Sequence, residues 1–336
     1  MSPDTVNILF LSFCIALVFM MQVGFLCFEA GAVRSKNTIN VASKNLLDFI
    51  IVTLAYVGLG FYIQYGAFNA LLENSPPDSK GSLYLFLMFQ TLFAATAATL
   101  VSGAVAERCG LKGYLIISLL IAAFIYPVAG QWIWGGTLGT KAGWLAQMGF
   151  IDFAGSTAVH SLGGSVALAA LLIIGPRKGV YEQENGFRGQ NIVLSLMGLL
   201  FLWLGWFGFN MGSLIKLGPL APVILINTFV AAAAGGIAAM IWSHFFDKKV
   251  NLLTVANGIL AGLVGITAGA HAMIPETAIV IGLISGLLYC FAMVLMNYFK
   301  LDDVVGAVPV HLAAGFWGTL AVALLGDPEV LDTGNE

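Results

Sequence analysis

Two stretches of this sequence carry the same pair of ionisable residues at the same spacing. DFAGSTAVHSLGG at 152–164 contains Asp152 and His160, and DDVVGAVPVHLAAG at 302–315 contains Asp303 and His311, eight residues apart in each case. The chain has four histidines and 17 acidic residues, so a given histidine has roughly a one-in-twenty chance of such an acid. Each aspartate also directly precedes an apolar run. It can therefore cap the N-terminus of a helix, attract a cation, or do both. The repetition indicates a paired functional site.

Two neutral histidines that face each other in an apolar surrounding would have a narrow chemistry. A neutral imidazole is both donor and acceptor, so the rings can share one hydrogen bond and pass a proton. They coordinate a hard alkali cation poorly, because such ions prefer rings of oxygen atoms. The pair therefore favours a small solute that can release a proton and cross as a neutral molecule. The structural alternative is that each histidine only hydrogen-bonds a neighbouring helix, but intramembrane ionisable groups usually mark a pathway.

The other acids and histidines near apolar segments have plainer interpretations. Glu29 and Glu107 lie beside basic residues, in FEAGAVRSKN and AVAERCGLK, and are expected to be ion-pair partners. His244 and His271 lack the repeated pattern and are expected to be interfacial or solvated.

The elements that must hold these residues are membrane spans. Hydrophobic residues make up 59% of the chain and charged residues 9%, and the mean hydropathy is +0.94. A bilayer core needs about 20 mostly apolar residues per helix, and helices satisfy their own backbone in lipid. We therefore predict an all-α integral membrane protein, a polytopic helix bundle. Ten segments qualify: 6–31, 44–70, 83–106, 113–131, 153–175, 190–210, 219–246, 252–272, 277–299 and 304–325.

Composition also argues against several classes of protein. The net charge of −3 is spread along the chain without a basic block, so no nucleic-acid partner is expected. The first apolar segment lacks the features of a signal peptide and is expected to remain as a span. The four cysteines suggest neither an external disulfide nor a metal site. Without a Ser/His/Asp cluster, metal motif or phosphate loop, neither an enzyme nor a bound cofactor is expected, and no Asn-Pro-Ala motif supports a water channel.

The basic residues predict the orientation of the chain. Eleven of them lie in loops after odd-numbered segments and three lie on the other side, which places the odd loops in the cytoplasm and the N-terminus outside. The expected location is the cell inner (plasma) membrane, with multiple spans. Five segments end with the first motif and five with the second, so the half-repeats, about 6–175 and 190–325, have opposite topology. Inverted repeats bring functional sites to mid-membrane, where His160 and His311 would face each other.

Six short motifs carry a resemblance to a known family: DFAGSTAVH, WFGFNMGS, AGLVGIT, LVSGAVAER, RSKN and DDVVGAVPVH. In this order and at this spacing they resemble the ammonium transporter (Amt/Rh) family over nearly the whole chain. The resemblance implies an ammonium transporter domain over 1–336, with an inverted five-plus-five helix repeat, an eleventh helix and a homotrimer with one pore per subunit. It implies recognition and transmembrane transport of ammonium or ammonia.

The resemblance also implies roles for individual residues along one path, without any metal or cofactor. Trp134 and Ser213 match the ammonium-binding vestibule, and Asp152 its structural support. Phe93 and Phe209 match the external gate, and His160 and His311 the twin-histidine pair of the pore. Trp206 and Thr267 match pore-adjacent positions.

Some features depart from the common pattern of the family. The sequence stops at TGNE after the tenth segment, so the last family helix is expected to be missing and the C-terminus to lie outside. Leu312, with Phe316 and Trp317, would narrow or close the inner pore. MMQVGFLCFEAGAVRSKNTINVASKNLLDF and GDPEVLDTG resemble a subgroup sometimes fused to signalling domains. The alternative function is therefore an ammonium sensor that signals to a fused or associated cytoplasmic histidine kinase, cyclase or regulatory protein, with little or no conduction.

Overall fold

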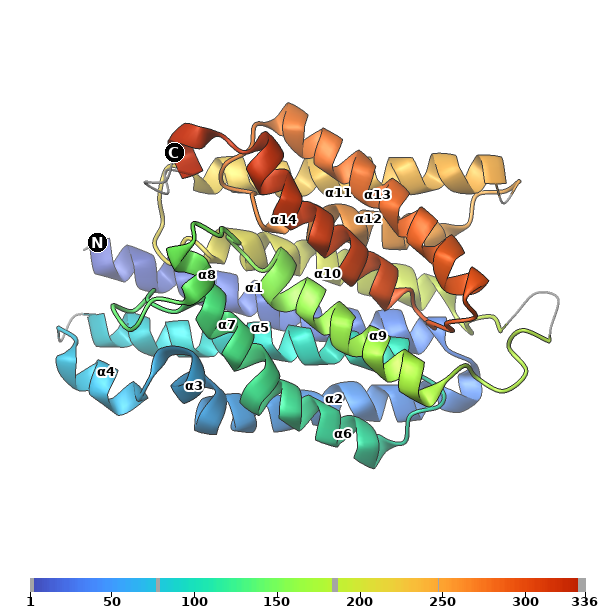
Figure 1. The fold of residues 1–336 in the computed structure, drawn as a ribbon, viewed down its shortest axis with the longest axis horizontal. Helices are drawn as coiled ribbons and strands as arrows, with labels where there is room; N and C mark the ends of the chain where they lie inside the picture. Colours follow the sequence, from blue (N-terminus) through green and yellow to red (C-terminus); the bar gives the residue numbers. More distant parts are fainter. Residues whose placement is uncertain (1–2, 77–78, 183–186, 247, 332–336) are drawn as a thin grey trace.

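A computed structural model describes residues 3–76, 79–182, 187–246 and 248–331, and over these residues the chain consists of helices and connecting loops (Figure 1). The α-helices are α1 (Pro3–Ala32), α2 (Thr38–Ala55), α3 (Phe61–Tyr65), α4 (Phe68–Asn74), α5 (Lys80–Ala104), α6 (Leu111–Leu120), α7 (Tyr126–Trp134), α8 (Trp144–Gln147), α9 (Leu162–Ile174), α10 (Ile192–Gly212), α11 (Ala221–Phe246), α12 (Leu252–Thr267), α13 (Pro275–Tyr298), α14 (Ala314–Leu325) and α15 (Pro328–Leu331). One 3₁₀ turn, η1 (Ser35–Asn37), precedes α2. Four π-helical turns join or begin longer helices: η2 (Tyr56–Gly60), η4 (Ile121–Ile125), η5 (Ser156–Ser161) and η6 (Val308–Ala313).

Nine helical stretches of the described residues are long and apolar enough to cross a membrane: Pro3–Ala32, Ser35–Tyr65, Lys80–Ala104, Leu111–Trp134, Ser156–Ile174, Ile192–Gly212, Ala221–Phe246, Pro275–Tyr298 and Val308–Leu325. They correspond to nine of the ten predicted segments, and the prediction of an all-α polytopic membrane protein is confirmed. The remaining segment forms α12, which has 16 residues and ends at Thr267 rather than near 272. It ends there because the carbonyl of Thr267 accepts the amide of Ala154, at 3.2 Å, instead of continuing the helix.

The second predicted segment also ends earlier than expected. Its helix stops at Tyr65 because Gly66 adopts a left-handed φ of 98°, a conformation that glycine adopts at little cost. The chain then turns into the separate short helix α4.

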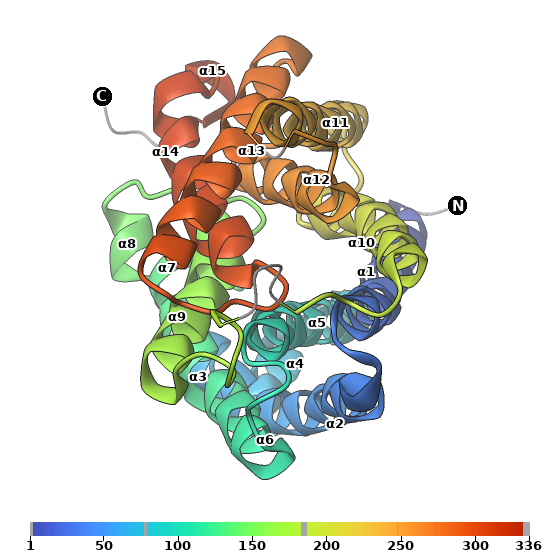
Figure 2. The same ribbon diagram turned by 90° about the vertical axis from the view of Figure 1, so that its right-hand side faces the viewer.

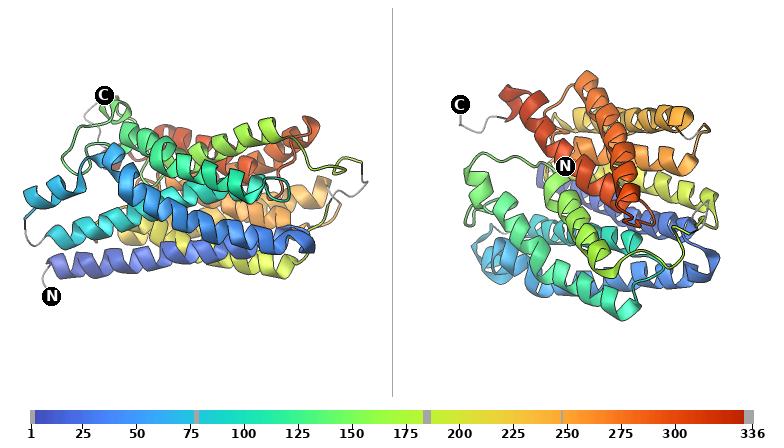
Figure 3. Two further views of the ribbon diagram at one scale, coloured as in Figure 1. Left: turned by 90° about the horizontal axis from the view of Figure 1, so that it is seen from below. Right: turned by 45° about the vertical axis from the view of Figure 1, so that its right-hand side comes forward.

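The long helices run roughly along one direction, so the bundle has two ends (Figures 1 and 3). α1 begins at the end that carries α4, α8 and α15, which we call the N-terminal end. The connections around Arg34, Arg108 and Arg177 lie at the opposite end, which we call the basic end. Both termini of the described chain therefore lie at one end, as an even number of passes requires.

Small residues let the helices approach closely. α1 packs along α10, and α11, α12 and α13 pack against one another (Figure 2). A Cβ atom added to Gly286 on α13 would lie 2.3 Å from the carbonyl oxygen of Gly235 on α11. A Cβ atom on Gly198 of α10 would lie equally close, 2.3 Å, to the backbone nitrogen of Phe28 on α1. These contacts bring backbones together, which is how helices associate where lipid removes the hydrophobic driving force.

A cluster of ion pairs joins the loops at the basic end. The buried carboxylate of Glu107 lies 3.0 Å from Arg34 and 2.6 Å from Arg177. Arg177 also holds Asp302 at 2.8 Å, and Arg108 lies 3.6 Å from the same aspartate. Burial alone would raise the pKa of Glu107, but the hydrogen bonds that it accepts, those of Arg34 and Arg177 among them, lower it to about 2. The prediction that Glu107 is an ion-pair partner is confirmed.

Candidate functional site

Asp152 holds the start of the helix that carries His160. Its Oδ1 accepts the amide of Gly155 at 2.9 Å, and its Oδ2 accepts the amides of Thr157 at 2.9 Å and Ala158 at 2.8 Å. The carboxylate is buried and satisfies three amides that a helix start leaves without partners. Asp152 therefore accepts the free amides at the start of η5, as the N-cap interpretation predicted, but from a position three residues before the N-cap residue Gly155.

Asp303 repeats this arrangement in the second half of the chain. Its carboxylate accepts the amides of Gly306 at 3.0 Å and Val308 at 2.7 Å, again the third and fifth residues after the acid. Gly155 and Gly306 have φ values of 108° and 77°, and this left-handed turn points the following amides back at the carboxylate. A six-residue π-helical turn, η5 or η6, then follows each glycine. The repeated spacing in the sequence is therefore a repeated structure.

The structure brings His160 and His311 together, because η5 and η6 are in contact. Their ring centroids lie 5.2 Å apart and their planes are inclined by only 16°. His160 is 0% exposed and His311 5%. Both ring nitrogens of His160 and Nδ1 of His311 are buried without a hydrogen-bond partner among the described residues. The expected hydrogen bond between the rings is not formed, because they stack instead of meeting edge to edge.

Trp206 and Thr267 position the first histidine. The indole of Trp206 stacks on His160, with centroids 4.9 Å apart. Its Nε1 donates to the hydroxyl of Thr267 at 2.8 Å, and that hydroxyl donates to the carbonyl of Leu263 at 2.7 Å. Both predicted pore-adjacent residues therefore act on His160, one by stacking and one through the other.

Phe93 and Phe209 form the next layer of the column. Their rings stack with centroids 3.9 Å apart and an inclination of 7°. Phe93 is 1% exposed and Phe209 0%, so no open passage separates the two rings. The ring of Phe209 also lies 5.6 Å from that of His160. The four predicted side chains Phe93, Phe209, His160 and His311 are thus contiguous.

A cavity of about 90 Å³ adjoins the phenylalanine stack toward the N-terminal end. It is lined by Tyr65, Phe86, Phe89, Gln90, Phe93, Trp134, Thr137, Phe153, Ser213 and Ile215. Trp134 donates from its indole nitrogen to the backbone carbonyl of Asp152 at 2.6 Å, and its ring lies 6.2 Å from Phe93. Ser213 donates to the carbonyl of Phe209 at 3.0 Å. The structure therefore brings Trp134 and Ser213 to one aromatic cavity, with Asp152 behind it.

The other two histidines lie outside this column. His244 is exposed near the end of α11, as expected. His271 is only partly exposed, because its ring stacks on Phe153 with centroids 4.2 Å apart. Burial lowers the pKa of His271 to about 4. His271 is therefore not a fully solvated residue, because its ring packs behind Phe153, which lines the outer cavity.

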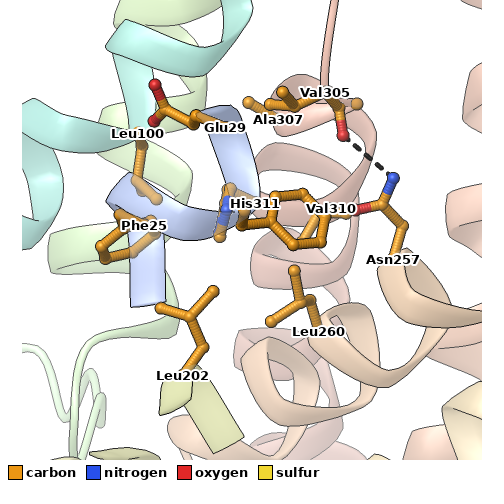
Figure 4. Close-up of a pocket in the computed structure, with 12 residues that line it drawn as sticks. Phe25, Glu29, Leu100, Leu202, Asn257, Leu260, Val305, Ala307, Val310 and His311 are labelled. Atoms are coloured by element: carbon orange, nitrogen blue, oxygen red, sulfur yellow. Dashed lines mark hydrogen bonds between the residues drawn. The ribbon is translucent and has the colours of Figure 1, made fainter. Parts of the chain in front are cut away.

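A second, smaller cavity lies beyond His311, toward the basic end (Figure 4). Its volume of about 20 Å³ holds one molecule the size of water. Its walls come from α1, α5, α10, α12 and the chain before and within η6: Phe25, Phe28, Glu29, Leu100, Leu202, Asn257, Leu260, Val305, Gly306, Ala307, Val310 and His311. The cavity is apolar apart from Glu29, Asn257 and His311, and Asn257 is held by the carbonyl of Val305 at 2.9 Å.

The structure overturns the expectation for Glu29. Among the described residues it has no ion-pair partner; its Oε2 accepts hydrogen bonds from Asn45 at 2.9 Å and Ser102 at 2.8 Å. It is 2% exposed and lines the inner cavity with His311. The sequence-based reasoning missed it as a site residue, although a carboxylate inside an apolar segment is itself a signal of function.

The expected obstruction by Leu312, Phe316 and Trp317 is also wrong. None of the three lines the inner cavity. The backbone of Leu312 packs against Gly164, where an added Cβ would lie 2.6 Å from its nitrogen. Phe316 is 63% exposed on the outer face of α14, and Trp317 donates to the carbonyl of Ile281 at 3.3 Å. The helical phase after His311 turns these side chains away from the column.

The column as a whole suits passage of a small neutral molecule rather than an ion. From Phe93 to His311 it presents aromatic and imidazole rings without a formal charge, and a charged group there would cost several kcal/mol. In the part of the chain that the structure describes, no group of three or more His, Cys, Asp or Glu side chains could hold a metal ion. Unpartnered imidazole nitrogens are the polar contacts available to a solute.

Comparison with known proteins places these features in a family. The sequence matches the model of the Ammonium Transporter Family over residues 9–336. It is 40% identical to a putative ammonium transporter, sll0537, of Synechocystis sp., over 98% of this chain and 63% of that protein. It is also 40% identical to ammonium transporter Amt2 of Archaeoglobus fulgidus, over 94% of this chain and 70% of the relative. The chain thus spans less than two thirds of the length of the Synechocystis protein.

Solved structures share the architecture. A sensor Amt protein matches with a TM-score of 0.93 at 38% identity, over 97% of this chain and 84% of the other. Mep2 of Candida albicans matches with a TM-score of 0.87 at 25% identity, over 98% of this chain and 75% of the other. Nearly all of the chain therefore shares its fold with both proteins.

Proposed function

This chain belongs to the ammonium transporter family, and we propose that it recognises ammonium and carries ammonium or ammonia across a membrane. The observation that carries the proposal is the contiguous column of Phe93, Phe209, His160 and His311 between two cavities. Such a column separates the two cavities by a layer of stacked rings, so a small neutral molecule can pass only when Phe93 and Phe209 part, and a hydrated ion is excluded.

Ammonium recognition takes place in the outer cavity. The aromatic face of Trp134 attracts a small cation through its ring quadrupole, and the hydroxyl of Ser213 accepts a hydrogen bond from it. No carboxylate lines this cavity, so a metal cation gains little there. Asp152 acts indirectly, by holding both the indole of Trp134 and the start of η5.

Ammonium gives up a proton to the external solvent at the outer cavity, so that an N–H bond breaks and neutral ammonia enters the column, because a charged ion between the stacked rings would cost several kcal/mol. Phe93 and Phe209 form the gate and part transiently to admit ammonia. The ammonia then contacts His160 and His311, whose nitrogens donate or accept its hydrogen bonds. Trp206 and Thr267 hold His160 in register.

The basic end faces the cytoplasm in this proposal and the N-terminus lies outside, because Arg34, Arg108 and Arg177 gather at one end. The membrane is the inner (plasma) membrane. The halves 6–175 and 190–325 act as inverted repeats that meet at the two histidines, and the twin Asp–Gly–His turns support this division. The exposed apolar side chains on the outer face, including Phe316, suit lipid and a homotrimer.

Reconstituted proteoliposomes test the proposal. An ammonium gradient is expected to drive current or uptake, and potassium is expected to drive neither. The double variant His160→Ala with His311→Ala is expected to lose discrimination or transport. His244→Ala, which changes an exposed histidine away from the column, is the matched control. Normal selective transport by the double variant would refute the role of the pair.

The second candidate is an ammonium sensor that signals to a cytoplasmic histidine kinase, cyclase or regulatory protein. Two observations favour it: the likeness to a sensor Amt protein and the closed stack of Phe93 and Phe209. Equilibrium ammonium binding measured beside flux separates the candidates. Tight binding without flux supports the sensor, and flux supports the transporter.

A further inference from the structure

A buried polar cluster lies beside the column and takes no part in the transport steps above. It is formed by side chains of α1, α2, α5 and α6: Gln22, Glu29, Lys44, Asn45, Asp48, Thr99, Ser102 and Tyr114. Lys44 and Asp48 are 0% exposed, although lysine and aspartate are rarely buried unless they are paired. A cluster of this kind inside a membrane domain is costly and calls for a function.

Hydrogen bonds divide the cluster into two groups on neighbouring turns of α2. In the first, Asn45 and Ser102 donate to Glu29. In the second, Thr99 donates to Asp48 at 3.3 Å, and Tyr114 donates to the same carboxylate.

Lys44 lies beside both groups on α2, on the side of the basic end, and its Nζ forms no hydrogen bond within the described residues. It is adjacent to Asn45 in the chain, and it shares a face of α2 with Asp48, four residues later. Its Nζ lies 5.8 Å from the ring centroid of Tyr114. Lys44 lies ~9 Å from the start of α2, at 1.5 Å per residue.

Four buried polar atoms of the cluster have no hydrogen-bond partner among the described residues: Gln22 Nε2, Lys44 Nζ, Asn45 Oδ1 and Asp48 Oδ1. An unsatisfied buried polar group costs about 1–3 kcal/mol, so such groups in proteins are normally bridged by buried water. Donors and acceptors both occur in this set, which is the composition that a hydrogen-bonded chain able to relay protons requires.

Glu29 connects the cluster to the transport path. Its Oε2 is bonded to Asn45 and Ser102, whereas its Oε1 accepts no hydrogen bond from the described residues. Its side chain lines the inner cavity in which His311 also lies (Figure 4). Phe25 adds an aromatic wall that suits a small cation. A carboxyl group therefore meets the solute just after the solute leaves the histidine pair.

We propose that Glu29 is the residue that returns a proton to ammonia in the inner cavity, supplied through Lys44, Asn45 and Asp48 from the basic end. In this step the O–H bond of the Glu29 carboxylic acid breaks and an N–H bond forms, so that ammonia becomes ammonium and Glu29 becomes a carboxylate. The carboxylate then takes up a proton from the cytoplasm along the buried cluster. The inference rests on the proposed function and adds to it the group that completes passage.

The surroundings of Glu29 suit this exchange. The ionisable groups that face it are Lys44 and Asp48 on α2, Tyr114 on α6 and His311 on η6, whereas α5 and α10 contribute no charge. In contrast to Glu107, Glu29 has no arginine partner among the described residues, so nothing holds it permanently as an ion.

The test compares Glu29→Gln with wild-type protein in proteoliposomes whose internal pH is set to a series of values. The labelled probe is methylammonium, and its initial uptake rate is measured at each pH. Glu29→Gln keeps the size of the side chain and an oxygen that accepts the hydrogen bond of Asn45, but its amide cannot exchange a proton with the solute. Its uptake is expected to fall about tenfold or more, as for loss of a general acid, and to lose its dependence on internal pH.

Two further variants complete the design. Lys44→Met leaves the cavity intact and interrupts the cluster, so it is expected to weaken the dependence on internal pH in the same direction. Glu276→Gln changes an exposed acid in the first turn of α13 and is the matched control, expected to behave as wild type. Wild-type rates and wild-type pH dependence in Glu29→Gln would overturn the inference alone. Absence of uptake in wild-type protein would overturn the proposed function, and this inference with it.

Infrared difference spectroscopy on wild-type protein with ¹³C-labelled glutamate gives a second readout that needs no folded variant. Among the described glutamates, Glu29 is the buried one without an arginine partner. Addition of ammonium is expected to change the carbonyl band of its protonated carboxyl group, and potassium is expected to leave it unchanged. An unchanged band with ammonium would contradict the proposed proton exchange.

Discussion

Replacement of Asp152 by alanine is expected to destabilise the bundle strongly and to displace His160. The carboxylate accepts the amides of Gly155, Thr157 and Ala158, all at 2.9 Å or less. Each amide left without a partner in a buried site costs about 1–3 kcal/mol, which gives a total of about 3–9 kcal/mol for three. Asp303→Ala leaves two such amides without a partner, so its cost is expected to be about 2–6 kcal/mol by the same reasoning.

The assay is equilibrium unfolding in mixed micelles, with methylammonium uptake measured in parallel. Asp152→Asn keeps one acceptor oxygen but turns an NH₂ group toward a backbone N–H, so its stability should fall between wild type and Asp152→Ala. Asp4→Ala, in the exposed first turn of α1, is the control. A loss below about 1 kcal/mol in Asp152→Ala, or a larger loss in Asp303→Ala, would refute the reasoning, because the amide count would then not set the energy.

Three further predictions follow from the same structure. Thr267→Val removes the acceptor of the Trp206 indole and should cost about 1–3 kcal/mol of unfolding free energy and lower flux, whereas Thr267→Ser should restore both. Phe209→Ala removes one of the stacked rings and should lower the free energy of unfolding by about 3–5 kcal/mol. It should also reduce the preference of uptake for ammonium over potassium. Unchanged selectivity would contradict the role of this ring as a gate. The pKa of Glu107 is lowered from 4.5 to about 2, so its carboxylate stabilises the basic end fully above pH 4.5, and this stabilisation is lost as the pH falls toward 2. The melting temperature of the protein should therefore drop between pH 4.5 and 2. In Glu107→Gln this drop should be smaller.

Hydropathy was sufficient to predict the class of the protein and most of its helices. A span must bury about 20 apolar residues, so its signal is local and survives without any knowledge of neighbours. The errors lie where tertiary contacts end a helix. α12 stops at Thr267 because the carbonyls of Thr267 and Ala268 accept hydrogen bonds from the backbone amides of Ala154 and Phe153. The sequence of α12 itself gives no sign of this contact.

The histidine pair was predictable for a different reason. Repetition of Asp152–His160 as Asp303–His311 is visible in the sequence, and an odd number of spans per half implies that the copies oppose each other. The parallel stacking of the rings was not predictable, because it depends on the way Trp206 and Thr267 hold His160. The role of Leu312 was misjudged because its direction depends on the phase of η6.

The sequence by itself determined the membrane class, the approximate spans, the paired Asp–His turns and the family, because each of these is written in composition, spacing or local motif. Only the tertiary structure decided which side chains meet: the stack of Phe93 on Phe209, the two cavities, and the position of Glu29 at the inner one. The physical reason is that burial and contact arise from helices brought together across the bundle, and a carboxylate such as Glu29 has the same local sequence whether it faces an arginine or a pore.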